Sequence, residues 1–135
     1  MERQKKVLDA SVLVKWFAEE VDVDKAIKLR DQHINKEIEI LMPEFSFLEI
    51  SNALYNKKKN EKEIFQANTD MFNLQLDIVH LTEELMKKAI NLSITYKVTI
   101  YDALYAAIAQ FHGAPFITAD AALAKLPNAV ALEKI

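Results

Sequence analysis

The stretch that decides the fold is Val7-Leu8-Asp9-Ala10-Ser11-Val12-Leu13-Val14, in which a short apolar run stops at an acid. An apolar run that ends at Asp9 is typical of a buried strand. The residues from Ser11 to Ala18 then show the spacing of a short helix. A strand that leads directly into a helix is the first half of a β–α unit.

The rest of the chain repeats this alternation of short apolar runs and longer helical patterns. Strands alternating with helices predict an α/β fold with a mostly parallel sheet. Pro43 suits the first turn of a helix, and Gly113 suits the left-handed position that ends one. Further strands are expected over 38–42, 78–81, 116–118 and 130–132, and helices over 22–36, 44–58, 62–76, 83–96, 100–113 and 120–126.

The composition is that of one globular domain spanning residues 1–135. Apolar residues make up 51% and charged residues 27%, and no run approaches the ~20 apolar residues of a membrane span. The charged start, and the acids and lysine within the first apolar stretch, do not resemble a signal peptide. A cytoplasmic location with no membrane association is therefore expected.

The residue types present restrict the metal chemistry. The chain has no cysteine, which excludes disulfides and zinc sites built on sulfur. His33, His80 and His112 lie far apart without ligand spacing, and we expect them at the surface or at helix ends. A bound metal would therefore be held mainly by oxygen, which favours Mg²⁺ or Mn²⁺.

The net charge of −3 means that contact with a nucleic acid would be local or assisted by cations. The densest basic run is Lys57-Lys58-Lys59, which has two interpretations. It is either a solvated helix C-terminus, where the dipole favours cations, or a patch that contacts phosphates. Lys15 is a further candidate for guiding a nucleic-acid strand.

Four acids fall where an α/β fold places its ligands. Asp9 and Asp120 follow the first and fourth strands, and Glu49 and Asp102 lie in the early turns of two helices. Ligands of parallel sheets bind outside the carboxyl ends of the strands, so these acids can converge on one rim. Asp102 also begins an almost wholly apolar helical stretch, where an ionised group is a functional candidate.

Each acid also has a structural interpretation. Asp9 and Asp120 could be N-caps, and Thr99 with Asp102 resembles a capping box. Glu49 could be an ordinary exposed acid, because the opposite helix face carries the expected core residues. Those core residues are Phe47, Ile50 and Leu54, and the aromatic residues Trp16, Phe65 and Phe72 are likewise expected in the core.

The pattern resembles the PIN-domain family, and most closely the VapC-type toxins of prokaryotic toxin–antitoxin pairs. Four pieces carry the resemblance in family order, namely residues 7–17, 43–54, 99–105 and 117–120. The resemblance implies a three-layer α/β/α sandwich around a twisted parallel sheet of strand order 3-2-1-4-5. It also implies an antitoxin partner and a homodimer.

The resemblance assigns metal-binding and catalytic roles to Asp9, Glu49, Asp102 and Asp120. Ser11, Asn52 and Thr118 match polar positions around the site. Many relatives carry another acid shortly after the last of these positions, where this chain has Ala121-Ala122-Leu123. That departure leaves open whether the site holds one metal ion or two.

Together these observations predict a Mg²⁺- or Mn²⁺-dependent endoribonuclease, in which carboxylates hold the metal that activates a water. One alternative is a binding module of the same fold that cuts nothing. Another is a small metal-dependent phosphohydrolase acting on free nucleotides. The latter would lack a phosphate-cradling glycine loop, because Gly113 is the only glycine.

Overall fold

A five-stranded parallel sheet runs through the computed structural model, which describes residues 3–135. Its order is β3-β2-β1-β4-β5, so β1 is central and β4 lies directly beside it. This confirms the α/β class and the order 3-2-1-4-5. The strands are β1 (Gln4–Leu8), β2 (Ile38–Pro43), β3 (Asp77–Val79), β4 (Phe116–Thr118) and β5 (Ala129–Ala131).

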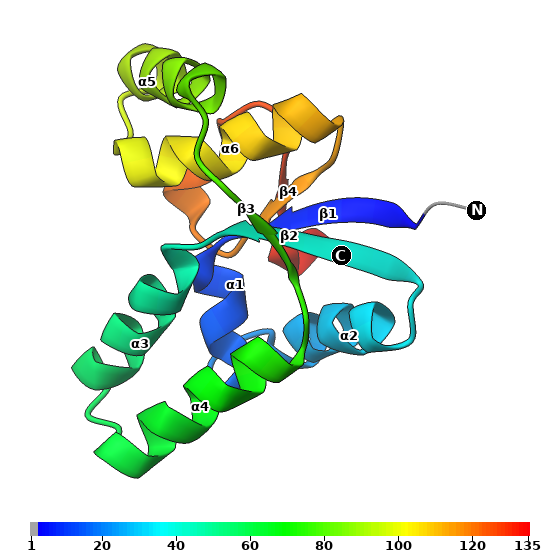
Figure 1. Ribbon diagram of the computed structural model, residues 1–135, viewed down its shortest axis with the longest axis vertical. Helices are drawn as coiled ribbons and strands as arrows, with labels where there is room; N and C mark the ends of the chain where they lie inside the picture. The colour runs from blue at the N-terminus through cyan, green and yellow to red at the C-terminus, as the bar shows by residue number, and fades with distance from the viewer. Residues whose placement is uncertain (1–2) are drawn as a thin grey trace.

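Helices cover both faces of the sheet and complete the three-layer sandwich (Figure 1). One layer holds α1 (Ala10–Leu13), the 3-10 turn η1 (Val14–Trp16), α2 (Val23–Ile34), α3 (Ser46–Asn56) and α4 (Glu61–Asn73). The other holds α5 (Glu83–Tyr96) and α6 (Ile100–His112). The short 3-10 turns η2 (Ala121–Leu123) and η3 (Leu132–Lys134) complete the chain.

The sheet divides the apolar interior into two clusters because successive side chains of a strand point to opposite faces. In β1, Leu8 packs with the layer of α1 to α4, whereas Val7 packs against α5 and α6. Ile117 and Phe116 of β4 divide in the same way. Both faces of the central strands are therefore buried, as the continuous apolar runs predict.

Local capping sets several helix ends, among them the predicted ones at Thr99 and Gly113. The Thr82 and Thr99 hydroxyls accept the backbone N–H groups of Leu85 and Asp102, which begins α5 and α6. Gly113 ends α6 at φ 61°, a left-handed conformation that costs glycine little. No helix within residues 3–135 combines the length and the apolar character needed to cross a bilayer.

Two expectations about this layer are wrong. Pro43 is the last residue of β2 and is not in a helix, and α3 begins only at Ser46. Proline is tolerated there because a strand end needs no further ladder donor. Phe65 and Phe72 are 62% and 61% exposed, because α4 buries Ala67 and Met71 instead.

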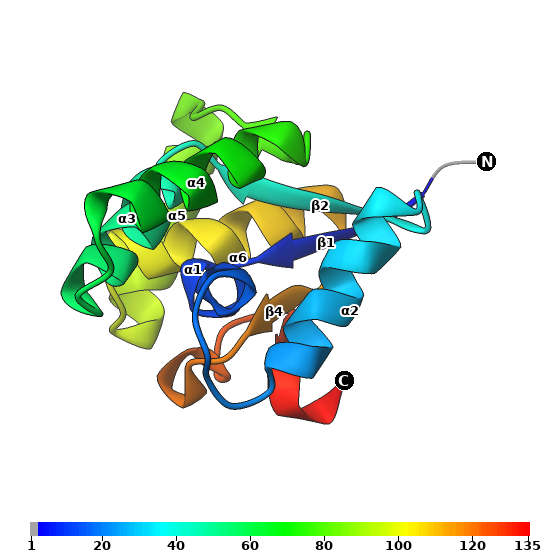
Figure 2. The same cartoon turned by 90° about the horizontal axis from the view of Figure 1, so that it is seen from below.

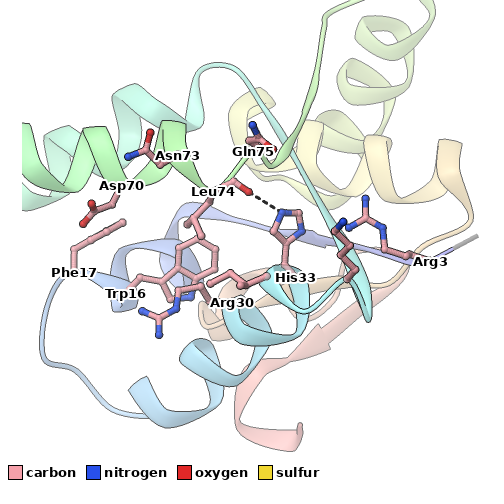
Figure 3. A pocket seen from close by; sticks show the side chains of 11 residues that line it. Arg3, Trp16, Phe17, Arg30, His33, Asp70, Asn73, Leu74 and Gln75 are labelled. Atoms are coloured by element: carbon pink, nitrogen blue, oxygen red, sulfur yellow. Dashed lines mark hydrogen bonds between the residues drawn. The ribbon is translucent and has the colours of Figure 1, made fainter.

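His33 lies in the last turn of α2, as a helix-end residue should, yet it is buried. Its Nδ1 accepts the backbone N–H of Ile40 at 3.2 Å, so its Nε2–H donates to the carbonyl of Leu74 at 3.0 Å. Figure 3 shows the imidazole pointing at that carbonyl. The ring thereby joins α2 to β2 and to the end of α4.

Candidate carboxylate site

Two neighbouring strands deliver Asp9 and Asp120 to the same edge of the sheet. Asp9 directly follows β1, and Asp120 comes two residues after the last residue of β4. Because β1 and β4 are adjacent and parallel, their carboxyl ends meet at one rim. The β1 arrow in Figure 2 points toward the end of the molecule where α3 lies, and Glu49 belongs to the first turn of α3.

Asp9 is held by three hydrogen bonds at the end of β1. Its Oδ1 accepts the Ser11 hydroxyl at 2.5 Å and the Val12 N–H at 3.3 Å, so it caps α1. Its Oδ2 accepts the Thr118 hydroxyl at 2.6 Å. Asp9 is therefore both an N-cap, as one interpretation predicted, and a carboxylate tied to the end of β4.

Ser11 of α1 and Thr118 of β4 join the segments that follow β1 and β4. The Ser11 oxygen accepts the Ala119 N–H at 2.9 Å, and the Thr118 oxygen accepts the Asp120 N–H at 3.1 Å. Each hydroxyl thus accepts one backbone bond and donates its proton to Asp9. The arrangement fixes the orientation of the Asp9 carboxylate.

Burial makes Asp9 electrostatically unusual. The residue is only 3% exposed, and this burial raises the pKa of its carboxyl from 3.8 to about 6. The three hydrogen bonds lower the pKa, and the nearby charge of Asp102 raises it further. A buried acid that remains without a cationic partner is a candidate for a functional group.

The charge of Asp102 affects the pKa values of two other candidate acids, and Asp102 is itself affected by Asp120. Burial raises the pKa of Glu49, and the charge of Asp102 adds to this effect. Burial also raises the pKa of Asp102, and the charge of Asp120 adds to it. The charge of Asp102 thus reaches Asp9 and Glu49, and that of Asp120 reaches Asp102.

Asp120 is also a local cap. Its Oδ1 accepts the Ala122 N–H at 2.9 Å and begins η2, so the second capping interpretation is confirmed as well. The side chains of Ala121 and Ala122 are exposed and apolar, and Leu123 is buried. Residues 121–123 therefore offer no further carboxylate beside Asp120.

Tyr105 is a neighbour of the site that sequence reasoning missed. Its hydroxyl donates to Glu49 Oε1 at 2.7 Å and lies 2.6 Å from the Ser46 oxygen. The sequence pattern places it in an apolar helical stretch and in the segment 99–105, but assigns it no role of its own. A tyrosine within a buried helix needs a hydrogen-bond partner, and that requirement is the signal that could have found it.

Comparison with known proteins agrees with this fold. A family model of the PIN domain matches residues 6–129. The chain belongs to the PIN-domain family. Comparison with curated protein sequences found no match.

Solved structures resemble this PIN domain over almost its whole length. A toxin–antitoxin complex from Klebsiella pneumoniae has a TM-score of 0.71 at 17% identity, covering 94% of this chain and 97% of that one. A Pyrobaculum aerophilum protein has a TM-score of 0.70 at 22% identity, covering 97% and 85%. Mycobacterium tuberculosis VapC20, a sarcin–ricin-loop-cleaving toxin, has a TM-score of 0.69 at 14% identity, covering 91% and 97%. At these identities the likeness concerns the fold.

Two of the lysines predicted to contact a nucleic acid, Lys15 and Lys57, form ion pairs within the PIN domain. Lys15 is buried, and its Nζ donates to the Val21 carbonyl at 2.7 Å and pairs with Glu20 at 3.2 Å. Lys57 pairs with the other oxygen of Glu20 at 2.7 Å. Glu20 thus bridges two lysines, which lower the pKa of its carboxyl against the effect of its burial.

The lysine run does lie at the C-terminal end of α3, as one interpretation required. Lys58 is exposed, and Lys59 makes a long ion pair with Glu63 at 3.9 Å. Asn52 is exposed on α3. In residues 3–135, the hydrogen bonds of the acids do not involve Asn52 or these lysines, so their roles stay predictions.

The donor chemistry of the PIN domain fits a hard divalent cation. Carboxylate oxygens are the preferred ligands of Mg²⁺ and Mn²⁺, and a cation relieves the mutual repulsion of clustered acids. No group of three or more His, Asp or Glu side chains in residues 3–135 is already close enough to hold a metal ion. The side chains therefore suit a divalent cation by their ligand type and charge, without forming a ready-made coordination shell in residues 3–135.

Proposed function

We propose that this PIN domain is a Mg²⁺- or Mn²⁺-dependent endoribonuclease and the toxin of a toxin–antitoxin pair. The observation that carries the proposal is the buried Asp9 carboxylate, which the Ser11 and Thr118 hydroxyls hold where the adjacent strands β1 and β4 end. A carboxylate as buried as Asp9 is unfavourable in its charged form when no cation lies beside it. A divalent cation at this rim would remove that penalty and attract a phosphate.

Asp9 and Asp102 are the proposed direct ligands, with Glu49 and Asp120 holding the ion through water. Ser11 and Thr118 keep the Asp9 oxygens in one orientation, which lowers the entropy lost when an ion binds. When bound, the ion supplies Lewis-acid chemistry at the scissile phosphate. Glu49 is the proposed acceptor of the proton from the attacking water, because its raised pKa brings it closer to neutral pH.

RNA is the proposed substrate, and the cytoplasm is the proposed place of action. A search for cleavage should begin with structured RNA, since one structural relative is described as cleaving the sarcin–ricin loop. Exposed positive charge for the flanking phosphates is available at Lys58, just after α3, whereas the charge of Lys57 is paired with Glu20. Each phosphate contact would add a salt-dependent contribution to RNA binding.

The proposed partner is an antitoxin protein that covers the acidic rim. Structural relatives described as toxin–antitoxin complexes support this assignment. We also propose that the chain forms a homodimer. Light scattering after gel filtration tests the dimer, and a monomer at all protein concentrations would contradict it.

The decisive experiment incubates the purified protein with defined single-stranded and stem-loop RNAs, in Mn²⁺ or Mg²⁺, with and without a chelator. We expect cleavage that EDTA abolishes and added Mn²⁺ restores. Asp102→Asn should lower the rate by more than about 100-fold, because it removes a proposed ligand.

Asp24→Asn is the matched control, since Asp24 is an exposed acid in the first turn of α2. It should cleave as the wild type does. Equal activity in the wild type and Asp102→Asn would refute the proposal. Cleavage of free nucleotides but not RNA would indicate a phosphohydrolase, and Mn²⁺ binding without any cleavage would indicate a binding module.

A further inference from the structure

A chain of two buried hydroxyl groups ends on Glu49. The Ser46 oxygen lies 2.6 Å from the phenol oxygen of Tyr105, which lies 2.7 Å from Glu49 Oε1. Ser46 begins α3 and Tyr105 belongs to α6, so the chain of hydrogen bonds joins the two helices that carry Glu49 and Asp102. Both hydroxyl-bearing residues are buried, with Tyr105 only 1% exposed.

The direction of these hydrogen bonds follows from counting protons. An ionised carboxylate can only accept, so the single phenol proton of Tyr105 goes to Glu49 Oε1. The phenol oxygen then accepts from Ser46, which donates its own proton. The order of donation is therefore from Ser46 through Tyr105 to Glu49.

The Tyr105 ring has little freedom to move. It stacks on Phe116 with ring centroids 6.0 Å apart and 6° between the planes. It also meets the Phe45 ring edge-on at 5.6 Å. Phe116 belongs to β4 and pairs with Val7 of β1, two residues before Asp9. The phenol is thereby held in register with the sheet edge that carries Asp9.

We propose that Tyr105 is a positioning residue for Glu49, holding Oε1 so that Oε2 is directed to a divalent cation or its water. This inference rests on the proposed metal-dependent function. Tyr105 itself does not touch the substrate or the ion. A glutamate has three rotatable side-chain bonds, and one fixed oxygen removes most of the freedom that ion binding would otherwise have to remove.

The test is Tyr105→Phe, which removes the hydroxyl and keeps the ring between Phe45 and Phe116. We expect Mn²⁺ binding, measured by calorimetry and by electron paramagnetic resonance, to weaken roughly 10-fold, within the range for lost outer hydrogen bonds to ligands. Tyr96→Phe is the control, because Tyr96 is a half-buried tyrosine in the core cluster of α5 and α6. It should bind Mn²⁺ as the wild type does.

A double-mutant cycle separates positioning from a general structural effect. If Tyr105 acts through Glu49, the Tyr105→Phe change should not weaken Mn²⁺ binding further in a Glu49→Ala background. Additive losses would overturn the inference. Ser46→Ala provides a second variant should Tyr105→Phe fold poorly, and it should weaken Mn²⁺ binding in the same direction by a smaller factor.

The outcomes distinguish this inference from the function on which it rests. Wild-type Mn²⁺ binding that Asp102→Asn abolishes, together with unchanged binding in Tyr105→Phe and Ser46→Ala, refutes the positioning role alone. Absence of Mn²⁺ binding in the wild type overturns both. The positioning role is supported if Tyr105→Phe weakens Mn²⁺ binding in the wild-type background but not in the Glu49→Ala background.

Discussion

Replacing Asp9 by asparagine should stabilise the protein in the absence of divalent cations, although it removes a proposed ligand. The pKa of the Asp9 carboxyl is about 6 in the folded protein and 3.8 as its reference value. The native state therefore keeps its proton to a higher pH than the unfolded chain does. The stability that this proton gives is complete below about pH 4 and is lost as pH rises to about 6.

The magnitude follows from the size of the shift. A difference of about two pKa units, at 1.36 kcal/mol each, makes ionised Asp9 cost about 3 kcal/mol at neutral pH. The burial of Asp9, at 3% exposure, means that solvent screens little of this. Asparagine avoids the charge, but it weakens the bonds from Ser11 and Thr118 by about 1 kcal/mol. The expected net gain for Asp9→Asn is about 2 kcal/mol.

Urea denaturation in EDTA at pH 4, 6 and 8 measures this gain. The free energies of unfolding of the wild type and Asp9→Asn should be similar at pH 4 and diverge by about 2 kcal/mol at pH 8. Asp24→Asn, at an exposed position, should follow the wild type throughout. An Asp9→Asn protein less stable than the wild type at pH 8 would show that the hydrogen bonds outweigh the buried charge, and would refute this reasoning.

Three further outcomes are expected. Asp102→Asn should lower the carboxyl pKa of both Asp9 and Glu49, because it removes a charge that raises them. A ¹³C NMR titration measures both pKa values, and unchanged values would contradict the coupling of these acids. His33→Ala should lower the free energy of unfolding by about 3 kcal/mol in urea melts, since two buried backbone groups lose their partner; a loss below about 1 kcal/mol would mean that water replaces the ring. Gly113→Ala should cost only about 1 kcal/mol in the same assay, from its left-handed φ of 61°, because nothing lies within 4 Å of the added methyl group. A much larger loss at that position would contradict the open surroundings.

The sequence predicted features that depend on nearby residues. The caps at Asp9, Thr99 and Asp120 and the end of α6 at Gly113 all involve contacts within a few residues. The burial of residues 103–109 follows from an apolar pattern on all sides of one helix. The same local information failed for Phe65, because an aromatic side chain on an amphipathic helix fits either a core or an exposed face.

The strand order came from resemblance to a family, since no residue pattern specifies which strands are neighbours. That order decides the contact between Asp9 and Thr118, which lie 109 positions apart. It likewise decides that Tyr105 meets Glu49 across 56 positions. Such contacts depend on how distant elements pack, so no local spacing encodes them.

By itself, then, the sequence determined the acids, their positions at strand and helix ends, and the elements that present them. Only the tertiary structure decided that Asp102 lies near enough to the other acids to alter their pKa values. It also decided that Asp9 is buried and that a tyrosine holds Glu49. The physical reason is that the energy of a charge depends on its solvation and its neighbours, and both are set by the packing of distant segments.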